Sequence, residues 1–553
     1  MDAAEIIRRW DAMFSERSVW EAHWKEVAQV VLPRSDWFQG GARTPGEKRT
    51  QSLFDSTATL ALDRFAAAME SMLVPRTQVW HGLRARAQEI AEDQSVKQWL
   101  EEVVEILFRE RYAPTANFAS QANDVFMSLG AFGTGAMFVD EARQRNGTRR
   151  GVRYRSVHLS ELCISENHQG VIDTVFRKMT MTARQIVERF GLDGISDKVK
   201  SHAEKRPDQP YDVLHAVYPN TGRVAGKLNY KGMPWASCYV LVDSAIRLEE
   251  GGFRSFPYAV GRYVTGPKEV YGRSPAMSVL PEIKTVNQMA GTLLRAGEKA
   301  LDPPLLLQED GALSAFDLRP GALNFGGVND QGNPVVHPLQ FSGQIGIGED
   351  MLERRRQAIN DTFLVTLFQI LVQAPSMTAT EAMLRAQEKG QLLAPTMGRQ
   401  QSEFLGPLIE RELDLLWHQG VFPPMPLALV QAGGLLDVEY SSPLNKAQRA
   451  EEGVAIMRTL ESVMPLAQSD PGVIRRFNMP KIAAELATIN GLPQKLMRTD
   501  EEIQAMDAQA AQQAQAQQLL AAAPVVSSAI KNMSQAQALA AAAPSQQAPN
   551  IFG

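Results

Sequence analysis

The sequence predicts a mainly helical α+β protein of several domains, and three observations lead to this fold class. Long segments in the N-terminal third and the C-terminal half repeat apolar residues at intervals near three and four, which is typical of amphipathic helices. Between residues 151 and 265 the pattern changes to short β-rich runs separated by Gly, Pro, Asn and Asp. The length of 553 residues is too great for a single hydrophobic core.

Composition is that of an ordinary soluble globular protein, with 44% apolar and 22% charged residues. No run approaches the ~18 apolar residues of a membrane span, and the charged N-terminus is unlike a secretory signal. The two cysteines, Cys163 and Cys238, favour a reducing compartment and argue against a disulfide framework. A net charge of −5 argues against tight binding of duplex DNA, which usually needs a basic excess, but allows weak sliding contact.

The N-terminal third is expected to be helical. Apolar periodicity and terminating prolines predict helices over residues 3–32, 53–73, 96–112 and 118–129. A glycine-containing segment then leads into a strand over 136–140. The spacing of its glycines indicates a turn rather than a nucleotide-binding site. The basic run ARQRNGTRRGVRYR that follows is best explained as the solvated flank of a hairpin. A patch for nucleic acid or a partner protein is the second interpretation.

The pattern of residues in the middle of the chain predicts two helices that form a stalk, with a small β-rich module at its far end. One helix follows Pro281 and continues to about residue 301, and a second covers 349–371, beginning with two acids that its dipole favours. Helices of this length are about 30 Å long. Short strands and turns occupy the 302–348 segment between them.

The C-terminal part begins with the loop VQAPSM. A capping box, Thr378 to Glu381, then starts a long helix in which Pro395 and Pro407 are the expected kinks. The segment DVEYSSPLNKAQRAEE and several helices lead to about residue 506. The Ala/Gln-rich stretch that follows, 511–553, is compatible with a peripheral helix or barrel, or with a disordered tail.

The sequence contains no pattern that favours catalysis. GRSPA resembles the G-x-S-x-G elbow of hydrolases, but Pro275 follows Ser274 and lacks the N–H that an oxyanion hole requires. Ser274 is therefore expected to be a helix N-cap. GARTPGEKRT departs from a phosphate-binding loop because Glu47 would face the phosphate. The histidines show no metal-binding spacing, so neither an enzyme nor a cofactor is expected, and a structural or assembly role is favoured.

Four stretches in order along the chain resemble one family, the portal or head-to-tail connecting proteins of short-tailed bacteriophages. They are LFDSTATLALDRFAAAMESMLVPRTQVW, YGRSPAMSVLPEIKTVNQM, TATEAMLRAQEK and VEYSSPLNKAQ. The resemblance extends from about residue 5 to about residue 500, and the Ala/Gln-rich tail departs from it. It implies a ring of about twelve subunits around an axial DNA channel, located in the virion at the portal vertex and in the host cytoplasm during assembly.

The resemblance also implies an order of parts. It assigns 1–273 to a wing, 274–301 and 349–371 to stem helices, 302–348 to a clip, 372–379 to a tunnel loop, 380–434 to a long kinked wing helix and 435–510 to a crown. The residues expected to face DNA are the tunnel-loop residues Gln373, Ala374, Pro375, Ser376 and Met377. The clip residues expected to dock partners are Asp310, Asp317, Arg319, Asn329 and Asp330.

Three consecutive arginines in the second stem helix, Arg354, Arg355 and Arg356, are candidates for transient DNA contact or for salt bridges between subunits. They span nearly a helical turn, so they cannot share one face, and salt bridging is favoured for at least two. Apolar positions near Phe363, Leu367 and Phe368 fit either a ring interface or the core of one chain.

The partners implied are further copies of the chain, double-stranded DNA without sequence preference, the terminase large subunit, the major capsid and scaffolding proteins, and a tail adaptor or tail tube. No membrane partner is expected. The alternative is another virion structural protein, an internal or tail component without a DNA channel.

Overall fold

The structure is a computed structural model that describes residues 1–38, 44, 46–91, 93–143, 149–224, 226–227, 229–307, 317, 323, 327–328, 331–338, 345–365, 395–440, 443–469, 472, 476–493, 496–498, 502–514 and 533–534. The chain divides into two compact units. Unit 1 comprises 1–82, 103–423 and 438–448, and unit 2 comprises 83–102, 424–437 and 449–553. The expected class, mixed α+β and mostly helical, is confirmed.

Two antiparallel sheets in unit 1 account for the β-rich region. The larger has the order β4-β5-β6-β7-β8, formed by Leu162–Glu166, Ile172–Thr182, Pro210–Pro219, Trp235–Leu241 and Ile246–Phe253. The smaller has the order β3-β2-β9, formed by Arg149–Val157, Thr134–Arg143 and Tyr258–Arg262. The β-rich pattern predicted most of these strands but missed β4 and the two short helices α7 (Ala183–Phe190) and α8 (Asp197–Lys205) that follow β5.

The helix predicted over residues 3–32 is wrong in one respect, because it is two helices, α1 (Ala3–Glu16) and α2 (Ser18–Val31). The break falls at Arg17, whose buried guanidinium donates to the carbonyl oxygens of Leu159 at 2.7 Å and Ser160 at 3.0 Å and to Glu21 at 2.7 Å. The apolar periodicity did not reveal this break, because both helices bury apolar residues at helical spacing.

The remaining N-terminal helices lie close to their predicted positions. They are α3 (Thr57–Leu73), α5 (Gln94–Arg111) and α6 (Phe118–Phe132). The start of α3 is later than predicted because the Asp55 carboxylate accepts the backbone N–H of Thr57 at 2.9 Å. α6 ends at Gly133, where φ is +77° and an added Cβ would lie 2.3 Å from the Gly272 oxygen, so only glycine fits this junction.

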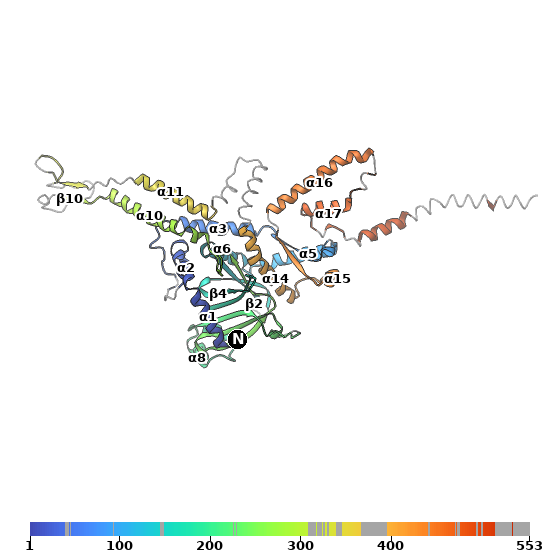
Figure 1. Cartoon of the computed structure of the whole chain (residues 1–553), viewed down its shortest axis with the longest axis horizontal. Helices are drawn as coiled ribbons and strands as arrows, with labels where there is room; N and C mark the ends of the chain where they lie inside the picture. The colour runs from blue at the N-terminus through green and yellow to red at the C-terminus, as the bar shows by residue number, and fades with distance from the viewer. Residues whose placement is uncertain are drawn as a thin grey trace, which may run out of the picture. The chain divides into compact units, whose positions relative to one another are not determined.

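The two predicted stalk helices are present in unit 1 as α10 (Leu280–Leu301) and α11 (Ile345–Thr362), which lie side by side (Figure 1). α11 starts four residues earlier than predicted and ends at Thr362, so the predicted extent to residue 371 is wrong: a turn follows at Phe363 and Leu364, where φ of Leu364 is +60°. Residues 366–371 lie outside the described part of the chain. Two short antiparallel strands, β10 (Leu305–Leu307) and β11 (Val336–Pro338), pair between the helices, as the β-rich pattern of this segment suggested.

The long C-terminal helix is described from residue 395 onward. It contains a π-helical turn over Gln401–Leu405, continues as α14 (Gly406–His418) and ends there, so the range of 380–434 assigned to it is too long. The widened turn ends two residues before Pro407, whose ring has no N–H and clashes with the preceding turn of a regular helix. A π-turn therefore lies next to the position at which the kink at Pro407 was predicted. The start of this helix, with the Thr378 capping box, lies outside the described residues.

Unit 2 is built mainly from short and medium helices. They are α4 (Gln88–Ala91), the first half of α5, α15 (Leu427–Gln431), α16 (Pro443–Ser469), which begins in unit 1, and α17 (Met479–Ile489). β1 (His81–Ala85) pairs with β12 (Leu436–Tyr440), a pairing that the sequence analysis missed. None of the helices in the described residues combines the length and the apolarity that crossing a bilayer requires.

Candidate functional site

Most of the residues expected to face DNA or partners lie outside the described part of the chain. This holds for the tunnel-loop residues Gln373 to Met377 and for the clip residues Asp310, Arg319, Asn329 and Asp330. Asp317 is described and half-buried. The candidate site that the structure does describe is therefore the base of the α10–α11 pair and its attachment to the rest of unit 1.

The base of α10 is buried and its far end is exposed. Ile283, Val286 and Ala290 are buried, whereas Leu294 is 57% exposed and Leu301 is 89% exposed. The Asn287 side chain fixes the base to the loop before α3, because its oxygen accepts the Phe54 N–H at 2.7 Å and its amide donates to the Ser52 carbonyl at 2.9 Å. One end of the helix pair is thus anchored while apolar side chains remain available further along it.

The three consecutive arginines of α11 have different surroundings. Arg355 forms an ion pair with Glu282 of α10, and Arg356 donates to the Asp55 carboxylate at 2.7 and 2.9 Å. Arg354 is exposed, and no ion pair is found for it among the described residues. Two of the arginines therefore have carboxylate partners within one chain, where the sequence suggested partners in a neighbouring subunit.

Asp55 links α11 to the start of α3, and its side chain is only 5% exposed. Burial raises the pKa of this carboxyl, but hydrogen bonds from Thr57 and Arg356 outweigh burial and hold the pKa below its usual value of 3.8. The charged form is therefore favoured in the folded protein. Stability from this group is present above the unfolded-state pKa and is lost as the pH falls through the folded-state pKa.

Asp55→Asn is expected to destabilise unit 1 by about 1 to 2 kcal/mol at neutral pH, because the Arg356 guanidinium loses its charged acceptor. Urea unfolding midpoints measured from pH 7 to pH 3 check this. The difference between the two proteins should begin to shrink below about pH 4, the unfolded-state pKa, and should continue to fall as the pH approaches the lower folded-state pKa. Asp350→Asn, at an exposed carboxylate of the same helix α11, is the matched control and should change little. A constant difference across this pH range would contradict the assignment.

The C-terminal end of α11 packs into the core of unit 1. Ile359 and Phe363 are fully or almost fully buried, and the Phe363 ring meets the Phe65 ring of α3 edge-on at 6.3 Å between centroids. Of the two interpretations of this apolar stretch, the core of a single chain is the correct one for Phe363. Leu367 and Phe368 lie outside the described residues.

Ser274 is an N-cap, as predicted. Its hydroxyl accepts the Met277 N–H at 2.9 Å and donates to the Ala131 carbonyl at 2.8 Å, and the side chain is 1% exposed. Both hydrogen-bonding roles of the hydroxyl are used for structure. Within the described ranges, no group of three or more His, Cys, Asp or Glu side chains is placed to hold a metal ion.

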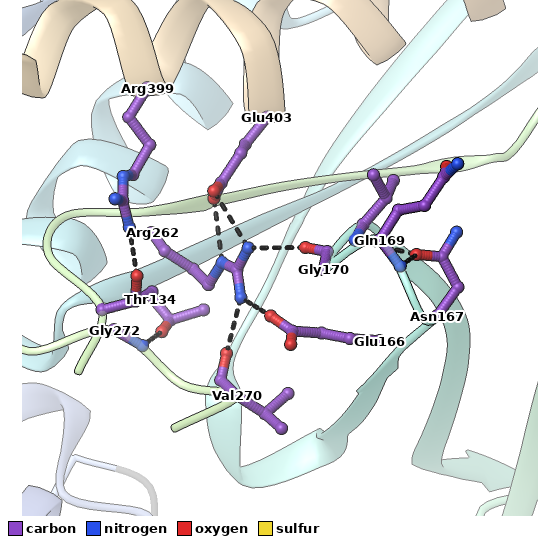
Figure 2. A network of polar contacts seen from close by, with 12 residues as sticks. Thr134, Glu166, Asn167, Gln169, Gly170, Arg262, Val270, Gly272, Arg399 and Glu403 are labelled. Carbon is purple, nitrogen blue, oxygen red and sulfur yellow. Dashed lines mark hydrogen bonds and ion pairs between the residues drawn. The ribbon is translucent and has the colours of Figure 1, made fainter. Parts of the chain in front are cut away.

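Arg262, the last residue of β9, is the centre of a network of hydrogen bonds and ion pairs (Figure 2). Its guanidinium donates to both oxygens of Glu403 at 2.9 Å, pairs with Glu166, and donates to the carbonyl oxygens of Val270 and Gly170 at 3.2 Å. All five N–H donors are therefore used, and burial, which lowers the pKa of Arg262, is outweighed by the two carboxylates.

This network joins segments that are far apart in the sequence. Glu403 belongs to the π-turn of the C-terminal helix, Glu166 ends β4, and Gly170 lies in the turn before β5 with φ +77° (Figure 2). Gln400 adds a hydrogen bond of 2.7 Å to the Arg262 carbonyl. The network thus fixes the described end of the helix that leads back toward the predicted tunnel loop.

A second buried ion pair, Arg111 with Glu412, connects α5 to α14. Both side chains are at most 1% exposed, and the Arg111 guanidinium lies 4.5 Å from the centroid of the Trp80 ring. Tyr154 donates its hydroxyl to the same carboxylate at 2.5 Å, and burial together with Glu412 raises the pKa of Tyr154 well above its usual value. The sequence analysis singled out neither this pair nor Arg262, although a charged residue inside an apolar strand or helix face was a usable signal.

Comparison with known proteins gives a family match over most of the chain. The model of the family described as "Bacteriophage head to tail connecting protein" matches residues 3–497. The chain is 28% identical over 519 residues to the "Probable portal protein" of Bordetella phage BPP-1, covering 93% of this chain and 92% of that protein. It is 27% identical over 543 residues to the "Portal protein" of Salmonella phage epsilon15, covering 96% and 95%.

Similar solved structures share less sequence. A chain of "Virion of native gene transfer agent (GTA) particle" is 12% identical with a TM-score of 0.34, covering 76% of this chain and 91% of that one. A chain of "Neck of native GTA particle computed with C12 symmetry" is 11% identical with a TM-score of 0.31, covering 74% and 87%. The assignment therefore rests on the sequence match. This chain belongs to the bacteriophage head to tail connecting protein family.

Proposed function

We propose that the chain is the subunit of a portal ring at one capsid vertex, through which double-stranded DNA is packaged and later ejected. The observation that carries the proposal is the family match over residues 3–497. It makes the chain a structural protein of the junction between a phage head and its tail. The ring, the channel and the docking of a terminase and then a tail go beyond this match and are parts of the proposal.

The α10–α11 pair supports the assignment of a stem. Its base is anchored by Asn287 and by the Arg356–Asp55 ion pair, and its exposed apolar residues include Leu294 and Leu301. Exposed apolar side chains on a protruding helix favour contact with another protein surface, which a ring of identical subunits would provide. The β10–β11 pair between the helices is the proposed start of the clip.

The charge of the chain suits a conduit that must pass phosphates without holding them. Roughly twelve copies, each with a net charge of −5, would form a strongly acidic ring that repels duplex DNA. Arg354 is the member of the arginine triplet with an exposed side chain and no ion pair among the described residues, so it is the better candidate for transient contact. The energy for translocation would come from the terminase, consistent with the absence of a phosphate-binding loop from this sequence.

Ser376→Glu tests the tunnel-loop assignment. A carboxylate in a loop that faces the channel should repel passing phosphates, so DNA packaging or retention should fall while the ring still assembles. Packaged DNA is measured per assembled particle. Ser201→Glu on α8 introduces the same side chain next to the five-stranded sheet and should package normally. Normal packaging and retention by assembled Ser376→Glu rings would contradict the assignment.

A further inference from the structure

The face of β3 in unit 1 presents two arginines into a concavity. Alternation along the strand places Arg153 and Arg155 on one face, while Tyr154 points the other way and reaches Glu412. β3 and the neighbouring β2 line one side of a hollow of about 900 Å³, and β5 and α7 line the other. We call this hollow the arginine groove.

Guanidinium groups outnumber carboxylates in the lining of the arginine groove, which contains Arg150, Arg153, Arg155 and Arg189 against Asp140, Glu141 and Glu188. Arg153 lies across from Asp140 on β2 and donates to the Thr115 carbonyl at 2.7 Å. Arg177 lines a smaller pocket that shares Arg153, Arg155 and Arg189 with the groove; it is buried and pairs with Glu161 at 2.9 Å. Arg155 makes no hydrogen bond or ion pair that the described residues provide, and its pKa is lowered first by burial and then by the positive charge of Arg177. Repulsion among these guanidinium groups is thus only partly compensated within the chain, and an anion in the hollow would relieve it.

Arg189 of α7 adds a pre-positioned donor on the opposite wall. Its guanidinium lies 4.4 Å from the centroid of the Tyr239 ring and donates to the Tyr239 hydroxyl at 2.5 Å. Its Nε is buried and has no acceptor among the described residues. The contact with Tyr239 holds the Arg189 side chain in place at the wall of the groove, where a ligand carboxylate could pair with the guanidinium.

The remaining lining distinguishes between possible occupants. The groove also contains the carboxylates of Asp140, Glu141 and Glu188 and the apolar side chains of Met179 and Met181. These carboxylates would repel the evenly spaced phosphates of a nucleic acid. A polypeptide can place acidic side chains against the arginines and apolar side chains against the methionines, which adapt well to varied surfaces.

We propose that the arginine groove is a docking site for an acidic, partly apolar peptide segment of another protein. Carboxylates of the segment pair with Arg153, Arg155 and Arg189, and its apolar side chains contact Met179 and Met181. The volume of about 900 Å³ holds a few side chains, so the segment is short. The site is independent of the proposed DNA channel, because none of its residues belongs to α10, α11 or the predicted tunnel loop.

The test measures binding of a dye-labelled peptide rich in glutamate and leucine to the full-length protein by fluorescence anisotropy. A copy with lysine in place of glutamate, and a duplex DNA oligonucleotide with the same dye, are measured in parallel. Arg155→Gln should weaken peptide binding about tenfold, because charge-assisted hydrogen bonds are roughly twice as strong as neutral ones. Arg184→Gln, an exposed arginine of α7 outside the groove, removes the same charge and should leave binding unchanged.

Arg155→Gln should fold normally, since Arg155 has no described partner to lose, and an unchanged or slightly higher melting temperature checks this. Arg153→Gln provides a second variant at an exposed position of the same strand. Equal binding to wild-type and Arg155→Gln protein, or no saturable binding of the glutamate-rich peptide, would overturn the proposal. Binding of DNA in place of the peptide, with the same loss in Arg155→Gln, would also overturn it and assign the groove to nucleic acid.

Discussion

Arg262→Met is expected to destabilise unit 1 by about 3 to 5 kcal/mol, because it leaves two carboxylates without their cation. Glu403 and Glu166 would remain beside each other near a largely buried position, and the carbonyl oxygens of Gly170 and Val270 would lose their donor. The urea midpoint of purified protein measures the loss. Hydrogen exchange at residues 399–405 should accelerate most, because the π-turn loses its attachment to β9.

Arg273→Gln is the matched control for this prediction. Arg273 pairs with Glu269 four residues earlier, but its side chain is 52% exposed, so the expected cost is below about 1 kcal/mol. A loss of similar size in both variants would mean that the Arg262 network contributes no more than a surface ion pair, and the account of helix anchoring would then be wrong.

Glu412→Gln is expected to destabilise unit 1 by a similar amount, about 3 to 5 kcal/mol, because it also leaves a buried charge without its partner. The variant leaves the Arg111 guanidinium fully buried against Trp80 without a negative partner. Glu410→Gln, two residues earlier on α14, is the control and should be neutral or slightly stabilising, since desolvation and the negative charge of Asp414 both raise the Glu410 pKa.

A double variant separates the loss of the ion pair from the loss of packing. Adding Arg111→Met to Glu412→Gln removes the unpaired cation and leaves an apolar chain against Trp80. The double variant should therefore be more stable than Glu412→Gln alone. Simple additivity of two destabilising effects in the urea midpoints would contradict a coupled, buried pair.

The elements that depend on local sequence could be predicted. The periodicity of α3, α5, α6 and α10, the N-cap at Ser274 and the irregular turn before Pro407 follow from residues within a turn or two of each feature. The different surroundings of the three arginines of α11 were also foreseeable in part, because three consecutive helical positions cannot face one way.

The features that depend on partners distant in the sequence could not be predicted. The helix break at Arg17 is fixed by carbonyl oxygens more than one hundred residues away, and the Arg262–Glu403 and Arg111–Glu412 pairs join segments separated by 141 and 301 residues. In the sequence alone, none of these arginines can be distinguished from a surface arginine. Only its position inside an otherwise buried strand or helix face indicates that a counter-charge must exist, and this does not identify the partner.

Imaging of the purified protein by negative-stain electron microscopy, with mass photometry on the same sample, tests the central claim most directly. The portal account predicts closed rings of about twelve subunits with an axial opening. Monomers, small closed oligomers or rings without an opening, under all conditions tried, would contradict the channel and favour an internal or tail component of the virion.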